Sequence, residues 1–138
     1  MTINWGRAVT AGILGSLTFS AIGLWISPLL VVLRSNPVDM LAENLGGNLA
    51  LAWAAHLAIG TVLAVIYAFV AARLPGTPAV RGALFAVAPW LLALLMSAMS
   101  GMLAGPMAIG SLLGHVAYGI VMGAVYGPVP PPAIPRIH

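Results

Sequence analysis

The chain has 138 residues, 62% of them hydrophobic and 5% charged, with a net charge of +3 and no cysteine. Soluble domains carry about 25% charged residues, so this composition excludes a water-soluble globular protein and indicates an integral membrane protein. It also excludes disulfides and cysteine nucleophiles, and the singly scattered arginines offer no basic patch for nucleic acid.

Four apolar segments are each long enough to cross a bilayer, which takes about 20 helical residues. They lie at residues 7–27, 48–72, 81–100 and 107–127. Each must be helical, because lipid offers no hydrogen-bond partner to a bare backbone amide. The sequence therefore predicts an all-α fold, an integral membrane four-helix bundle that occupies residues 1–127.

The connection between the first two spans, residues 28–47, is long and polar. Within it, Asn36 followed by Pro37 predicts the start of a short helix, because asparagine caps helices and proline suits the first turn. The pair Gly46-Gly47 predicts the end of that helix. We therefore expect a short amphipathic helix on the membrane surface.

The arginines are distributed unevenly between the two predicted sides of the membrane. The loop between the first two spans holds Arg34 beside Asp39 and Glu43. The other side holds Arg7, Arg73, Arg81 and Arg136. Cytoplasmic loops carry the excess of arginine, so both termini are predicted to be cytoplasmic, and the Ala/Gly/Leu/Val-rich composition favours a bacterial inner membrane. The prolines of residues 128–138 predict an extended tail, either docked on a neighbouring subunit or disordered.

The pattern His-x3-Gly-x6-Tyr occurs once in the second span and once in the fourth. Its residues are His56, Gly60 and Tyr67, and His115, Gly119 and Tyr126. Together with a weaker match between the first and third spans, it predicts two tandem helical hairpins, a parallel repeat about an axis along the membrane normal. The two histidines would then lie at the same depth and face one another.

Two hypotheses explain this pair of histidines. In the first, each is neutral, because no span contains an acid, and acts as packing glue by hydrogen bonding to a neighbouring helix. In the second, His56 and His115 are the axial ligands of one haem b, with Gly60 and Gly119 giving the flat ring room. Ligation of a magnesium tetrapyrrole by one histidine is a weaker variant of the second.

Small residues recur at every fourth position along three of the spans, a pattern that lets helix backbones approach closely. The candidate packing residues are Gly12, Ser16, Gly60, Ala64, Gly119 and Gly123. We expect neither a catalytic residue nor a metal site. The chain has no Gly-x-Ser-x-Gly elbow, and the spans have no carboxylate or thiol to orient a histidine or complete a zinc site.

The combined motifs resemble a family of small bacterial inner-membrane proteins that is classed as a domain of unknown function. They are Trp53, His56 and Gly60, then Arg81, Gly82 and Trp90, then the run from His115 to Gly127. The resemblance covers nearly the whole chain, although the segment from Met99 to Gly105 departs from the family's Met-Pro-x-Ala-Gly pattern. It implies four spans and no particular activity.

Three functions remain open from the sequence. The leading hypothesis is a non-enzymatic accessory or scaffold subunit without a cofactor, which packs by its glycine ridges against a larger respiratory or photosynthetic membrane complex. Its partners would be the lipid bilayer and other membrane subunits. The alternatives are a bis-histidine haem protein in electron transfer and an oligomeric channel or transporter for a small solute.

Overall fold

The computed structural model describes residues 3–31, 36–99 and 105–130, and within these ranges the chain is entirely helical apart from short turns and ends. Four of the helices are long and apolar enough to cross a membrane: Trp5–Leu29, Leu49–Arg73, Pro78–Met99 and Ala108–Tyr126. The predicted all-α, four-span membrane fold is therefore confirmed.

The first span begins at α1 (Trp5–Ala21), whose N-cap Asn4 accepts a hydrogen bond of 3.0 Å from the Arg7 amide. It runs on through a π-helical turn, η1 (Ile22–Ile26), into α2 (Ser27–Val31). The helix thus extends beyond its predicted end at residue 27. The wider π turn accommodates the ring of the following proline, which would otherwise clash with the preceding turn.

The short helix predicted in the first loop is confirmed as α3 (Pro37–Asn44). The side chain of Asn36 caps it by accepting a 3.3 Å hydrogen bond from the Val38 amide. Gly46 and Gly47 end the segment with φ angles of 66° and 82°, in a region that side chains disfavour and glycine tolerates.

The three remaining spans begin and end within a few residues of their predicted limits. The second is α4 (Leu49–Val70), which ends in a 3₁₀ turn, η2 (Ala71–Arg73). The third is α5 (Pro78–Met99) and the fourth is α6 (Gly105–Tyr126).

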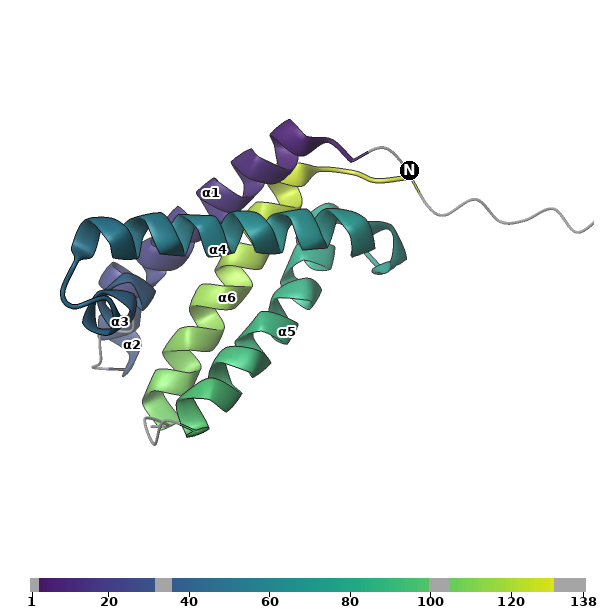
Figure 1. The fold of residues 1–138 in the computed structure, drawn as a ribbon. Helices are drawn as coiled ribbons and strands as arrows, with labels where there is room; N and C mark the ends of the chain where they lie inside the picture. The colour runs from purple at the N-terminus through teal and green to yellow at the C-terminus, as the bar shows by residue number, and fades with distance from the viewer. Residues whose placement is uncertain (1–2, 32–35, 100–104, 131–138) are drawn as a thin grey trace, which may run out of the picture.

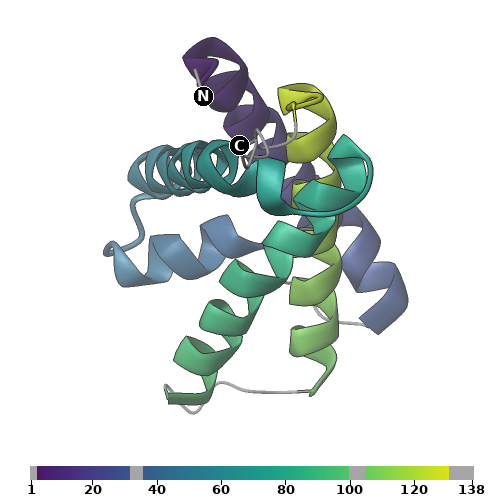
Figure 2. The same cartoon turned by 90° about the vertical axis from the view of Figure 1, so that its right-hand side faces the viewer.

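The helices are arranged around the pair α1 and α6, which lie side by side in opposite directions (Figure 1). Helix α4 packs on α1, α5 packs on α6, and α3 packs against α4. From the short loop that joins them, α4 and α5 diverge, as Figure 2 also shows. An exact twofold axis between the hairpins would make α4 and α5 as close as α1 and α6. The duplicated hairpin therefore stays a prediction.

Small residues bring the helices together. A Cβ atom on Gly12 would lie 2.5 Å from Thr61 Cα, and one on Gly82 would meet the Gly119 carbonyl oxygen and lie 2.9 Å from Gly123 Cα. All six candidate packing residues are buried within the chain: Gly12, Ser16, Gly60, Ala64, Gly119 and Gly123. These ridges pack against the chain's own helices, and contact of the chain with another protein stays a prediction.

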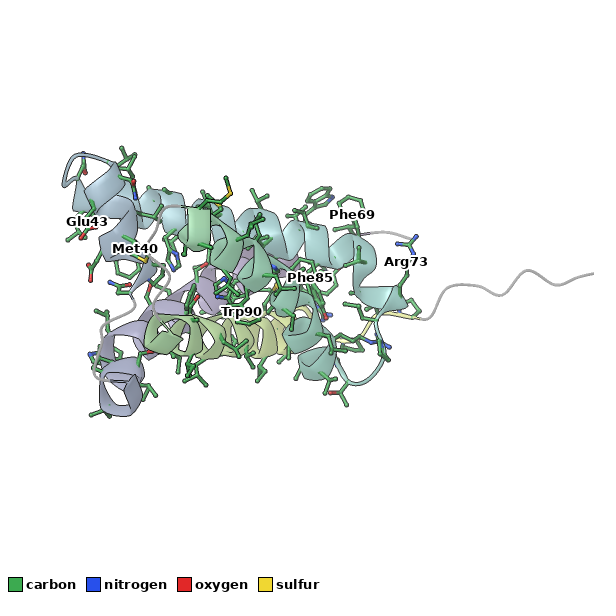
Figure 3. All side chains as sticks on the ribbon, turned by 90° about the horizontal axis from the view of Figure 1, so that it is seen from below. Met40, Glu43, Phe69, Arg73, Phe85 and Trp90 are labelled. Atoms are coloured by element: carbon green, nitrogen blue, oxygen red, sulfur yellow. The ribbon has the colours of Figure 1, made fainter. Side chains whose placement is uncertain are left out.

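Charged residues separate to the two ends of the bundle. At one end, Arg81 donates a 3.4 Å hydrogen bond to the Val129 carbonyl, and Arg7 lies close to Gly127. Figure 3 shows Arg73 at this end and Glu43 at the opposite one. We call the first the arginine end, defined by Arg7, Arg73 and Arg81. Arg34, Arg136 and the tail from residue 131 lie outside the described residues.

Candidate ligand pocket within the membrane

A cavity of about 430 Å³ lies among the spans. Helices α4 and α5 form its two sides, α1 and α6 form its base, and α3 closes the end opposite the arginine end, where Met40 is seen in Figure 3. Exposed side chains of both flanking helices line it, Ile59 from α4 and Leu92 from α5. The cavity therefore opens sideways, toward the position of the lipid.

The lining is mostly apolar and includes a small number of polar side chains. These are Ser16, Asn44, His56, Ser97, Ser111, His115 and Tyr118. Largely apolar walls with a few placed polar groups are typical of sites that bind small molecules. Both histidines singled out in the sequence belong to this set, so the structure brings them to a single cavity.

His56 joins α4 to α1. The residue is 6% exposed, and its Nε2 atom lies 3.0 Å from the Ser16 carbonyl oxygen and 3.1 Å from Ser20 Oγ. Because a carbonyl oxygen only accepts, Nε2 carries the proton and donates. This contact is the interhelical hydrogen bond that the packing-glue hypothesis describes.

His115 bonds instead to its own helix. Its Nδ1 atom lies 2.8 Å from the Ser111 carbonyl oxygen, one turn earlier in α6, and 3.4 Å from Ser111 Oγ. Nδ1 therefore carries the proton, and the Nε2 atom of the neutral ring has a free lone pair. Among the described residues, that Nε2 atom takes part in no hydrogen bond.

The ring of Phe19 contacts both histidines. Its centroid lies 5.9 Å from that of His56 and 4.7 Å from that of His115. The space beside the two glycines predicted to make room for a tetrapyrrole is occupied by other groups of the chain. Ser16 Oγ lies against Gly60, and Gly119 packs on Gly82. Haem ligation by both histidines would thus require Phe19 to leave its position and His56 to give up its hydrogen bond.

For two residues of the site, the sequence predicts no function. The Tyr118 hydroxyl donates a 2.7 Å hydrogen bond to the Gly60 carbonyl and is buried. Tyr118 lies three residues after His115, a spacing that places both on one helix face, so this signal was present in the sequence. Phe19 carried no such signal, because a phenylalanine in an apolar span is ordinary.

Ser16 is buried, with 1% of its surface exposed, and its Oγ atom has no hydrogen-bond partner in the described part of the chain. A buried hydroxyl without a partner is uncommon and costs free energy. Within the described residues, no group of three His, Cys, Asp or Glu side chains lies close enough together to hold a metal ion. The polar groups suit hydrogen bonding rather than metal coordination.

Four apolar spans, a core of small residues and a cavity open to the side define a small polytopic helical membrane protein. Residues 3–133 match the model of a family described as a family of unknown function, DUF6789, and the chain belongs to that family. The resemblance to a family of unknown function is thereby confirmed. No curated protein and no solved structure matches the chain.

Proposed function

We propose that this protein is a non-enzymatic membrane subunit that holds a lipid-soluble small molecule in the cavity between α4 and α5. The observation that carries the proposal is the cavity itself, which lies within the spans and has largely apolar walls. A ligand that enters from the side must first dissolve in the bilayer. Its apolar part would replace lipid contacts along Ile59 and Leu92, and the polar residues at the base would orient it.

The experiment places a large side chain in the cavity by substitution of a small residue on α5. Ala93 lines it on α5, whereas Ala88 is exposed on the same helix and lies outside the lining. The protein, purified with native lipid into nanodiscs, is examined by native mass spectrometry for a retained small molecule and by displacement of a fluorescent apolar probe. Ala93→Phe should abolish retention and probe binding, and Ala88→Phe should preserve both. Equal binding by the two variants, or no binding by the unaltered protein, would overturn the proposal.

The setting we propose is that of an accessory subunit of a larger respiratory or photosynthetic complex in a bacterial inner membrane, with both termini in the cytoplasm. Because the glycine ridges are covered internally, a partner would contact the larger exposed side chains of α4 and α5, such as Phe69 and Leu91. Isolation of a larger complex that contains the chain at fixed stoichiometry tests this setting. A lone, monodisperse protein in mild detergent extracts would count against it.

The other two functions lack a supporting observation in the described residues. A haem between His56 and His115 conflicts with the position of Phe19, and an oligomeric channel or transporter has no feature of the single chain in its favour. Both remain hypotheses from the sequence.

A further inference from the structure

We infer that the molecule bound in this cavity carries a hydroxyl group, and that His115 binds it by accepting a hydrogen bond at Nε2. The inference rests on the proposed function and specifies the class of ligand: a membrane-soluble phenol or alcohol, in preference to its ether or ketone counterpart.

The first step concerns the protonation of His115. A histidine cation within a membrane needs an anion or water to compensate the cost of leaving water. The described spans contain no Asp or Glu, and both acids of the chain, Asp39 and Glu43, lie exposed on α3. His115 is therefore neutral, and its single ring proton is the one that Nδ1 donates to the Ser111 carbonyl.

The second step concerns the direction of the free lone pair. Nδ1 is turned back along α6 toward Ser111, so the opposite edge of the ring, which carries Nε2, is turned away from that bond. His115 lines the cavity, and the Tyr118 hydroxyl beside it is already committed to the Gly60 carbonyl. An acceptor with no donor among the described residues thus lies at an apolar cavity, where a ligand donor can satisfy it.

The third step concerns a second polar group on another wall. Ser16 of α1 lines the same cavity, and its buried Oγ atom has no partner in the described part of the chain. A serine hydroxyl can both donate and accept. Ser16 Oγ is buried against Gly60, so it would reach a ligand hydroxyl only by rotating toward the cavity, and His115 Nε2 is the group that binds the ligand.

The chemistry selects against a carbonyl head group. A ketone, quinone or ether oxygen only accepts, so its lone pairs would face the lone pair of His115 Nε2 and leave both acceptors unsatisfied. Because the ether or ketone cannot form this hydrogen bond, we expect the hydroxyl ligand to bind roughly two- to tenfold tighter.

The test compares ligands that differ by one group. Dodecylphenol and its methyl ether are titrated into the full chain in nanodiscs against the fluorescent apolar probe, with dodecanol and 2-dodecanone as the aliphatic pair. We expect each hydroxyl compound to bind roughly two- to tenfold tighter than its matched compound. The ratio between dodecylphenol and dodecanol then shows whether the head group is aromatic or aliphatic. Because this comparison uses the unaltered protein, it does not depend on the folding of a variant.

Variants assign the preference to His115. The preference should vanish in His115→Phe and persist in Leu113→Phe, the same new side chain at an exposed position of α6 outside the cavity lining. It should also persist in part in His115→Gln, which retains an acceptor. Equal binding of the matched compounds, tighter binding of the ether or ketone, or an unchanged preference in folded His115→Phe would overturn the inference while leaving the proposed function intact. Binding of none of the compounds would overturn the proposed function itself.

Discussion

The hydroxyl of Tyr118 on α6 donates a 2.7 Å hydrogen bond to the carbonyl oxygen of Gly60 on α4. Through this bond, α4 is tied to the fourth span as well as to α1, on which it packs. The absence of a side chain at Gly60 leaves this carbonyl accessible. The two residues together tie one side of the cavity, on α4, to its base on α6.

Removal of this hydroxyl should loosen α4. We expect Tyr118→Phe to lower the free energy of unfolding by about 1 kcal/mol, because interhelical hydrogen bonds in membranes are worth about 0.6–2 kcal/mol. The measurement is SDS-induced unfolding in mixed micelles. Tyr126→Phe is the matched control, since Tyr126 is also buried and its hydroxyl has no hydrogen bond in the described region. Equal losses in both variants would contradict this role of Tyr118.

A methyl group at the α5–α6 contact should be poorly tolerated. A Cβ atom on Gly82 would meet the Gly119 carbonyl oxygen, whereas one on Gly6 would meet only Asn4 Oδ1 at 3.7 Å. Overpacking of this kind costs about 1–3 kcal/mol, so Gly82→Ala should lower the free energy of unfolding by that amount and Gly6→Ala should leave it nearly unchanged. Thermal unfolding followed by circular dichroism tests the difference. A Gly82→Ala variant as stable as Gly6→Ala would show that α5 can shift at no cost.

The two histidines should contribute differently to stability. His56 bonds to the Ser16 carbonyl across a helix interface, and His115 bonds to the Ser111 carbonyl within its own helix. We expect His56→Leu to cost about 1 kcal/mol more than His115→Leu, since only the first loses a link between helices. The measurement is the free energy of unfolding of both variants without added ligand. The reverse order would assign the structural role to His115 and undermine its assignment as the ligand's partner.

Natively purified protein should show no Soret band, because Phe19 contacts both imidazole rings and His56 Nε2 is engaged by Ser16. An absorption spectrum of the purified protein is the measurement. A Soret band that disappears in both His56→Ala and His115→Ala would establish the haem hypothesis and displace the one proposed above.

The orientation can be tested with new cysteines, because the chain has none of its own. Glu43→Cys on α3 should react with a membrane-impermeant maleimide in intact cells or spheroplasts. Thr77→Cys, in the loop between α4 and α5 at the arginine end, should react only after the membrane is opened. This follows if the arginine end is cytoplasmic. The opposite labelling pattern would invert the topology, and labelling of both positions in intact cells would indicate dual topology.

Much of the fold follows from the sequence because its signals are local. Apolar length predicts the spans, and the cap at Asn36 with the turn at Gly46-Gly47 predicts α3. The tilt and rotation of each span are set by contacts with other spans, and here small residues occupy several faces of the helices. The divergence of α4 from α5 was therefore not predictable.

Some features of the candidate site could likewise be predicted from the sequence, and others could not. His56 and His115 were identifiable because polar side chains within spans are rare and costly. Their different hydrogen bonds could not be predicted, because a histidine can bond to its own helix or to a neighbouring one. Which of the two it does depends on how the helices pack. The position of Phe19, and the Ser16 hydroxyl that has no partner in the described part of the chain, depend likewise on how α1 is rotated.

Helices α4 and α5 are joined at one end and spread toward the other (Figure 2), so the cavity between them is wedge-shaped, and a ligand bound there would hold its wide end open. Lateral pressure from the surrounding acyl chains favours closure of such a cavity, and a bound molecule favours the open form. Bilayer thickness and chain order would therefore tune occupancy without any change in the protein, and loading would respond to the physical state of the membrane as well as to the amount of ligand dissolved in it.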